Sequence, residues 1–168
     1  SRRMIIFVLT LALTPFVVSS LDIAYGATST ITFQVQGVSS DAAGVLLTID
    51  GSATCTYADL PKSFTWDVNS THTYSYSSPV SGGAGKRYVW SSTSGSGQTS
   101  QSGTLTVSQD GTVTASYTTQ YYLTLNAPSY AGPTGQGWYD AGTQASFSTN
   151  SPISGGTGTQ YVFIGWTG

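Results

Sequence analysis

The sequence predicts an all-β protein, an antiparallel sandwich-like β module followed by an incomplete second β repeat. Three observations predict this class. Apolar and polar residues alternate with a period of two through most of the chain after residue 26. No stretch has apolar residues at helical spacing between a cap and a stop. Only 7% of residues are charged, while 39% are hydrophobic and 12% aromatic, so the chain can bury a core and keep a hydroxyl-rich surface.

Residues 1–26 are predicted to be an export signal. Arg2 and Arg3 precede an apolar run over residues 5–18, and Ala24-Tyr25-Gly26 puts small residues at the two key positions before a cleavage site. The run falls short of the roughly 20 apolar residues that span a bilayer. We therefore expect a secreted or cell-surface protein whose mature part begins at Ala27 and shows no membrane span.

The first strand is expected over residues 30–36, where Ile31, Phe33 and Val35 share one face. This pattern predicts a half-buried antiparallel strand. Two hairpins are expected next, because Asp-Gly dipeptides readily adopt the positive φ of tight turns. One joins residues 45–49 to 53–57 through Asp50-Gly51, and the other joins 104–107 to 112–117 through Asp110-Gly111. In all, about eight short strands are expected between residues 27 and 119.

An internal repeat relates two parts of the chain at an offset of 73 residues. Residues 67–90 align without a gap to residues 140–163, with ten identities in 24 positions. The motif Ser-Pro-x-Ser-Gly-Gly occurs in both copies, at 78–83 and 151–156, and predicts a loop between two strands. A glycine-rich anion-binding nest is the alternative, but no helix start follows the motif.

The repeat divides the mature chain into a sandwich-like module at 27–119 and a truncated second repeat at 120–168. The closing hairpin of the second copy would begin near position 176. We therefore expect residues 27–119 to unfold cooperatively, and residues 121–168 to be loosely ordered alone with an uncovered apolar face.

Two segments carry a resemblance to a known family. Residues 137–143 (Gly-Trp-Tyr-Asp-Ala-Gly-Thr) and the closing Gly165-Trp166-Thr167-Gly168 resemble the divergent internalin-B-type B-repeat, also called the bacterial repeat domain. The preceding unit is similar to modules that occur in tandem in large exported archaeal proteins. The resemblance implies surface display, neighbouring modules in the same chain as partners, and no catalysis. The first unit departs from the pattern where Trp90-Ser91-Ser92 replaces the Gly-Trp close.

The titratable residues predict no enzyme and no cofactor. His72 lies in an alternating run and is matched by Ala145, so an exposed strand position is expected. Asp67 and Asp140 are equivalent and suggest a turn made twice, while Cys55 is expected to be a buried hydrophobe. The spacing fits neither zinc nor calcium ligands. With three cations and six aspartates in residues 27–168, nucleic acid is not an expected partner.

These observations favour a non-enzymatic spacer or adhesion stalk of a larger surface protein, with surface glycans or other cell-surface proteins as candidate partners. A carbohydrate-binding module is the alternative, in which Trp138 and Trp166 would stack on sugar rings. A strand-exchanging filament subunit is a lesser alternative, because Ala27 to Ser29 is a short donor segment. Asn69-Ser70-Thr71 is a candidate N-glycosylation site.

Overall fold

The computed structural model describes residues 26–168, so the predicted export signal, except Gly26, lies outside the described residues. The described chain is almost entirely β, which confirms the predicted fold class. Among these residues no helix is long and apolar enough to cross a membrane. The elements are β1 (Thr28–Gln36), β2 (Leu47–Ile49), β3 (Ala53–Cys55), η1 (Tyr57–Asp59), β4 (Lys62–Asp67), β5 (Thr71–Tyr76), β6 (Val80–Ser81), β7 (Lys86–Ser94), β8 (Ser102–Thr106), β9 (Gly111–Leu123), η2 (Ser129–Ala131), β10 (Gly137–Asp140), β11 (Ile153–Ser154) and β12 (Gln160–Tyr161).

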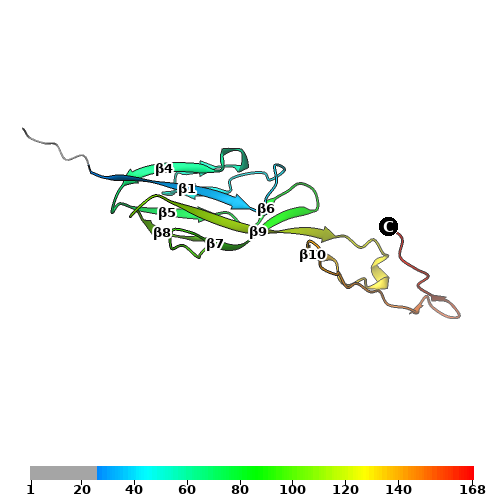
Figure 1. Cartoon of the computed structure of the whole chain (residues 1–168). Coiled ribbons are helices and arrows are strands. Elements are labelled where there is room, and N and C mark those ends of the chain that lie inside the picture. Colours follow the sequence, from blue (N-terminus) through cyan, green and yellow to red (C-terminus); the bar gives the residue numbers. More distant parts are fainter. Residues whose placement is uncertain (1–25) are drawn as a thin grey trace, which may run out of the picture.

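Strands β1 to β9 form a curled sandwich of two sheets (Figure 1). One sheet has the order β4-β1-β9-β7-β6, and the other has the order β3-β2-β5-β8. Strand β9 then leaves the sandwich and pairs with β10, so that the C-terminal part extends away from it (Figure 1). The molecule is therefore elongated along β9.

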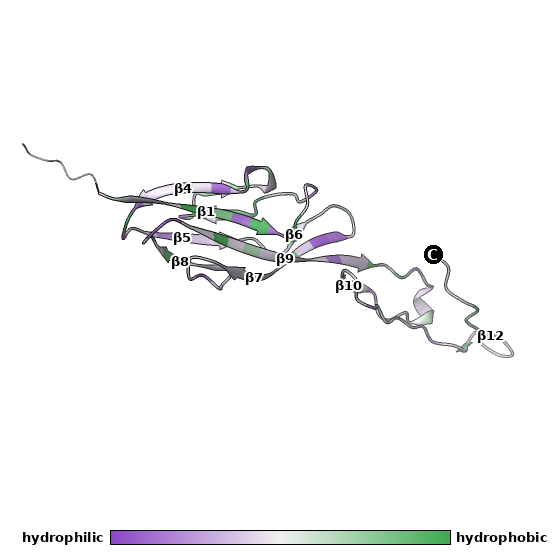
Figure 2. Cartoon of the chain, viewed as in Figure 1, coloured by the Kyte–Doolittle hydropathy of each residue, from purple (hydrophilic) through white to green (hydrophobic). Residues whose placement is uncertain are grey.

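The core lies between the two sheets and follows from the alternation in the sequence. Along β1 the apolar and polar residues alternate, as the hydropathy colouring shows (Figure 2). Tyrosines take part as fully as aliphatic residues, because each buried hydroxyl finds an acceptor. The buried core consists of Ile31, Phe33, Leu46, Leu47, Ile49, Cys55, Tyr74, Tyr76, Val80, Tyr88, Leu105, Val107, Val113, Ala115 and Tyr117.

The first predicted hairpin is confirmed. β2 and β3 are antiparallel, and they are joined through Asp50 with φ 50° and Gly51 with φ 69°. These positive angles match the right-handed twist of the two strands.

The second predicted hairpin is wrong. β8 pairs with β5 in one sheet, whereas β9 pairs with β1 and β7 in the other. The Asp110-Gly111 dipeptide carries the chain between the sheets, and Asp110 Oδ1 accepts a hydrogen bond of 2.7 Å from the amide of Thr30. Because neither residue has a positive φ, the dipeptide does not form a two-residue hairpin turn.

The prediction for β1 is half correct. Ile31 and Phe33 are buried on one face as expected, and β1 is antiparallel to β4. It is, however, parallel to β9 on its other side. Alternation reports which face is buried and carries no information on strand direction.

The two Ser-Pro-x-Ser-Gly-Gly segments have the same local structure. The motif itself supplies a short strand, β6 or β11, and its glycine pair starts the turn. In each copy the first glycine amide donates to a carbonyl four residues later, and the serine before proline accepts an amide twelve residues later. The bonds are Gly82 N to Lys86 O (3.0 Å), Gly155 N to Thr159 O (2.9 Å), Trp90 N to Ser78 Oγ (2.9 Å) and Phe163 N to Ser151 Oγ (2.8 Å).

A second correspondence concerns the end of β9. Gln120 lies opposite Asp140 in the β9·β10 pair, as Thr28 lies opposite Asp67 in the β1·β4 pair. Residues 120–128 therefore occupy the place of β1 in the second unit, at an offset of 92 residues. The predicted boundary between residues 119 and 120 lies within β9, whose thirteen residues run from one unit into the next.

Candidate functional site

The candidate residues indicated by the sequence lie in different parts of the structure. Cys55 is buried, as predicted, and burial raises the pKa of its thiol. Asn69 is exposed in the turn between β4 and β5, with φ 71°. Its side chain is therefore accessible to a modifying enzyme. Trp66 and Trp90 are partly buried and pack against the core.

His72 is not the exposed strand residue that was expected. Its Nδ1 lies 2.7 Å from Asp50 Oδ2, and its Nε2 lies 3.0 Å from Ser70 Oγ. The ring also stacks on Trp66, with the centroids 3.8 Å apart. The interaction with His72 and the amide of Thr73 hold the pKa of the Asp50 carboxyl below its usual range. This cluster could not be predicted from the sequence, because Asp50 and His72 meet only through the pairing of β2 with β5.

The order Asp50, His72, Ser70 has the connectivity of a hydrolytic triad, but its protons are committed elsewhere. The Ser70 hydroxyl donates to the carbonyl of Asp67 over 2.6 Å. Thr143 makes the same bond to the carbonyl of Asp140, over 2.7 Å, in the repeat copy that has no histidine. A hydroxyl proton held by a turn carbonyl is not available to an imidazole base. The cluster therefore fastens the β2–β3 turn to β5.

Among residues 26–168 there is no group of three His, Cys, Asp or Glu side chains that could hold a metal ion. The remaining candidate sites lie at the two ends of the C-terminal unit. One is the place where β9 leaves the sandwich, and the other is a cavity near the C-terminal end of the described chain.

We call the first of these the junction, formed by Arg87, Gln120, Trp138 and Asp140. The Arg87 guanidinium carbon lies 4.2 Å from the centroid of the Trp138 ring. Arg87 Nε donates to Gln120 Oε1 over 2.7 Å, and Gln120 Nε2 donates to Asp140 Oδ1 over 2.8 Å. Trp138 also packs edge to face on Tyr122. Because the guanidinium covers one ring face, Trp138 presents no free stacking platform on that side.

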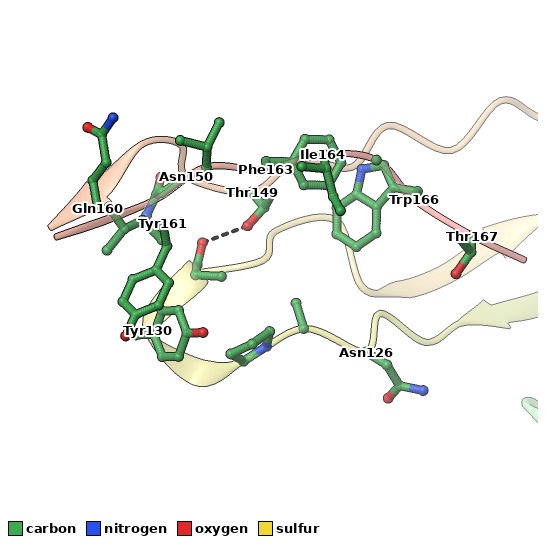
Figure 3. Close-up of a pocket in the computed structure, with 16 residues that line it drawn as sticks. Asn126, Tyr130, Thr149, Asn150, Gln160, Tyr161, Phe163, Ile164, Trp166 and Thr167 are labelled. Atoms are coloured by element: carbon green, nitrogen blue, oxygen red, sulfur yellow. Dashed lines mark hydrogen bonds between the residues drawn. The ribbon is translucent and has the colours of Figure 1, made fainter. Parts of the chain in front are cut away.

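The second site is a cavity of about 600 Å³ with a mixed apolar and polar lining, bounded on one side by residues 126–131, on the other by residues 160–167, and between them by Thr149, Asn150 and Ile153. Figure 3 shows Phe163 and Trp166 on one of the two segments and Tyr130 on the other, where it lies beside Tyr161. Trp166 packs against Phe147 and Phe163, with ring centroids 5.3 Å apart in each pair. We call this cavity the slot.

The structure does not bring the two predicted sugar-stacking residues together. Trp166 lines the slot, whereas Trp138 belongs to the junction and does not line the slot. The sequence did not indicate either site as a whole. Each is formed by segments that are distant in the sequence. The junction depends on the pairing of β9 with β7 and β10, and at the slot the amide of Asn150 donates to the carbonyl of Ala131 over 2.9 Å.

The architecture defines the class of the protein as an all-β, sandwich-like fold that continues into a second β unit. No protein-family profile, no curated protein and no solved structure matches this chain.

Proposed function

We propose that this chain is part of an exported cell-surface protein, in which β modules follow one another in tandem and act as a stiff spacer or adhesion stalk. The single observation that carries the proposal is β9, which has no linker between its two parts. Its thirteen residues correspond to roughly 40 Å of continuous strand at about 3.3 Å per residue. Flexible module connections normally consist of exposed Gly- or Ser-rich residues instead.

The contacts at the junction support the same role. Arg87 comes from β7 of the first unit, and Trp138 and Asp140 come from β10 of the second. A cation–π contact and the hydrogen bond from Arg87 to Gln120 thus cross between the units, and the bond from Gln120 to Asp140 holds Gln120 in place. Bending at the junction has to break the two crossing contacts together with the pairing of β7 with the end of β9.

Two further features fit a stalk exposed to solvent outside the cell. The surface is rich in hydroxyl side chains, and Asn69 offers an accessible glycan acceptor. The internal repeat and the resemblance to B-repeats favour neighbouring modules in the same chain as the first partners. Surface glycans or other cell-surface proteins would then bind elsewhere along the array.

The test is the distance distribution between two spin labels, one on each side of the junction. Thr104→Cys on β8 and Gln144→Cys after β10 are exposed positions, and Cys55→Ala removes the native thiol. A stiff stalk gives one narrow distribution, which broadens in Arg87→Ala. Lys62→Ala is the matched control, since Lys62 is an exposed cation remote from the junction. A broad distribution in the unmodified background would exclude the spacer role.

The carbohydrate-binding alternative is favoured by one observation, the partly exposed Trp166 ring with the amide side chains of Asn126, Asn150 and Gln160 around the same cavity. A glycan screen tests it. Binding that quenches tryptophan fluorescence and is lost in Trp166→Ala, but kept in Trp138→Ala, would support a sugar site in the slot.

A further inference from the structure

The walls of the slot can be identified from the two offsets, of 92 and 73 residues, that relate the second unit to the first. Residues 120–128 take the place of β1, and residues 159–167 take the place of β7 at the offset of 73. In the first unit β9 lies between β1 and β7 and pairs with both. The slot is thus the position that β9 occupies in the first unit.

Side chains that are buried in the core of the first unit are uncovered in the second. Tyr88 is 1% exposed, whereas its counterpart Tyr161 is 49% exposed. Tyr74 is 3% exposed, whereas its counterpart Phe147 is 42% exposed. None of residues 121–168 is buried. Exposed apolar clusters of this kind are typical of interaction sites.

The backbone of both walls also lacks strand partners. In the described chain, residues 162–167 make no backbone–backbone hydrogen bond, and the Phe163 amide is bonded to the Ser151 side chain instead. On the opposite wall, the Leu125 amide is bonded to the Gln136 side chain, and residues 124–127 have no strand partner. Two unpaired edges that face one cavity form a template for one added strand.

The lining defines the chemistry of that strand. The side chains around the slot are apolar or uncharged polar, and Asp140, the one charged residue in 121–168, is not among them. A charged strand would lose its hydration without gaining a partner. In the first unit the inserted strand β9 is uncharged and places Val113, Ala115 and Tyr117 on its buried face.

We propose that the slot is a docking site for one extended, uncharged β strand of the β9 type, with a branched, a small and an aromatic residue at alternate positions. The strand runs parallel to residues 120–128 and antiparallel to residues 160–167, as β9 does between β1 and β7. This inference rests on the correspondence between the units and not on the stalk role. A flexible junction would leave it intact.

The experiment appends a copy of residues 96–119 to the full chain directly after Gly168, which restores the spacing of the first unit. Tethering raises the effective concentration of the strand, so that weak docking becomes measurable. Hydrogen exchange of the amides of Tyr161 to Trp166 is the readout. We expect it to slow at least tenfold relative to the unextended chain, and the fluorescence of Trp166 to shift to the blue.

The matched control is the same extension with Asp in place of the copied Val113, Ala115 and Tyr117, which should leave exchange unchanged. Amides of β9 in the first unit report that the sandwich remains folded in every variant. Equal exchange in the extended and unextended chains, or equal slowing by both extensions, would overturn the proposal. So would concentration-dependent protection of the unextended chain together with dimer sedimentation, because a second copy would then be the occupant.

Discussion

Removal of one buried hydroxyl, in Tyr76→Phe, tests how the two sheets are held together. Tyr76 is fully buried on β5, and its single hydroxyl proton is shared between the carbonyls of Val113 at 3.2 Å and Gln34 at 3.3 Å. These acceptors belong to β9 and β1, the parallel pair in the opposite sheet. The hydroxyl is therefore a polar contact between the sheets through the core.

Tyr76→Phe lowers the free energy of unfolding because the two buried carbonyl oxygens lose their hydrogen-bond donor. A buried acceptor without its partner costs about 1–3 kcal/mol, whereas an ordinary hydrogen bond contributes about 1 kcal/mol. We expect Tyr76→Phe to lower the free energy of unfolding by about 2 kcal/mol. Tyr74→Phe is the matched control two residues away, because its hydroxyl donates to the carbonyl of the exposed Ser100 over 3.0 Å, where water can replace it. Its cost should be about 1 kcal/mol or less.

Urea denaturation measures both variants. With a slope of about 2 kcal/mol per molar, the midpoint should fall by about 1 M for Tyr76→Phe and by about half of that for Tyr74→Phe, at an unchanged slope. An equal or larger loss in Tyr74→Phe would refute the reasoning, since the buried and the solvent-facing acceptors would then be equivalent.

Three further predictions concern the titratable groups. Burial raises the pKa of Tyr117 to about 12, and also raises the pKa of Tyr76. The contribution of these two tyrosines to the free energy of unfolding should therefore be fully present below pH 10 and fall as the pH rises towards 12, by at most about 1.4 kcal/mol per pH unit for each tyrosine. Urea midpoints at pH 8 and pH 11 measure this loss, and equal midpoints would contradict it. Since the pKa of Asp50 is lowered, the contribution of its carboxylate to the free energy of unfolding is present above about pH 4 and is lost as the pH falls. Asp50→Asn should therefore destabilise the protein at pH 7 and have less effect at pH 3. Equal destabilisation at both pH values would contradict this prediction. Hydrolysis of p-nitrophenyl acetate should be the same in His72→Phe as in the unmodified chain, and a loss of turnover with the fold intact would restore the triad interpretation.

Local chemistry made part of the fold predictable. At Asp50-Gly51 the turn requires positive φ at two successive residues, which the dipeptide tolerates, so the hairpin could be derived from the residues themselves. The alternation in β1 likewise identified Ile31 and Phe33 as core residues. The repeat identified equivalent positions, and the Ser78 and Ser151 loops share the same hydrogen bonds.

The failures concern pairings between distant residues. Asp110-Gly111 has the same residue types as Asp50-Gly51, yet it connects two sheets, because the partners of β8 and β9 are strands elsewhere in the chain. A hydrophobic period of two does not identify those partners. For the same reason the contact of Asp50 with His72, and that of Arg87 with Trp138, could not be derived from spacing.

The central claim is that β9 belongs to both units without a break, and amide hydrogen exchange along this strand tests it most directly. The backbone of β9 is bonded to β1 and β7 in its first part and to β10 at its end, and the amide of Tyr122 donates to Gly85 O over 2.9 Å. Protection should therefore continue from Val113 through Thr119 to Tyr122. Fast exchange from Thr118 to Tyr122 beside a protected Val113 would mean that a flexible linker joins the two units, and would contradict the account.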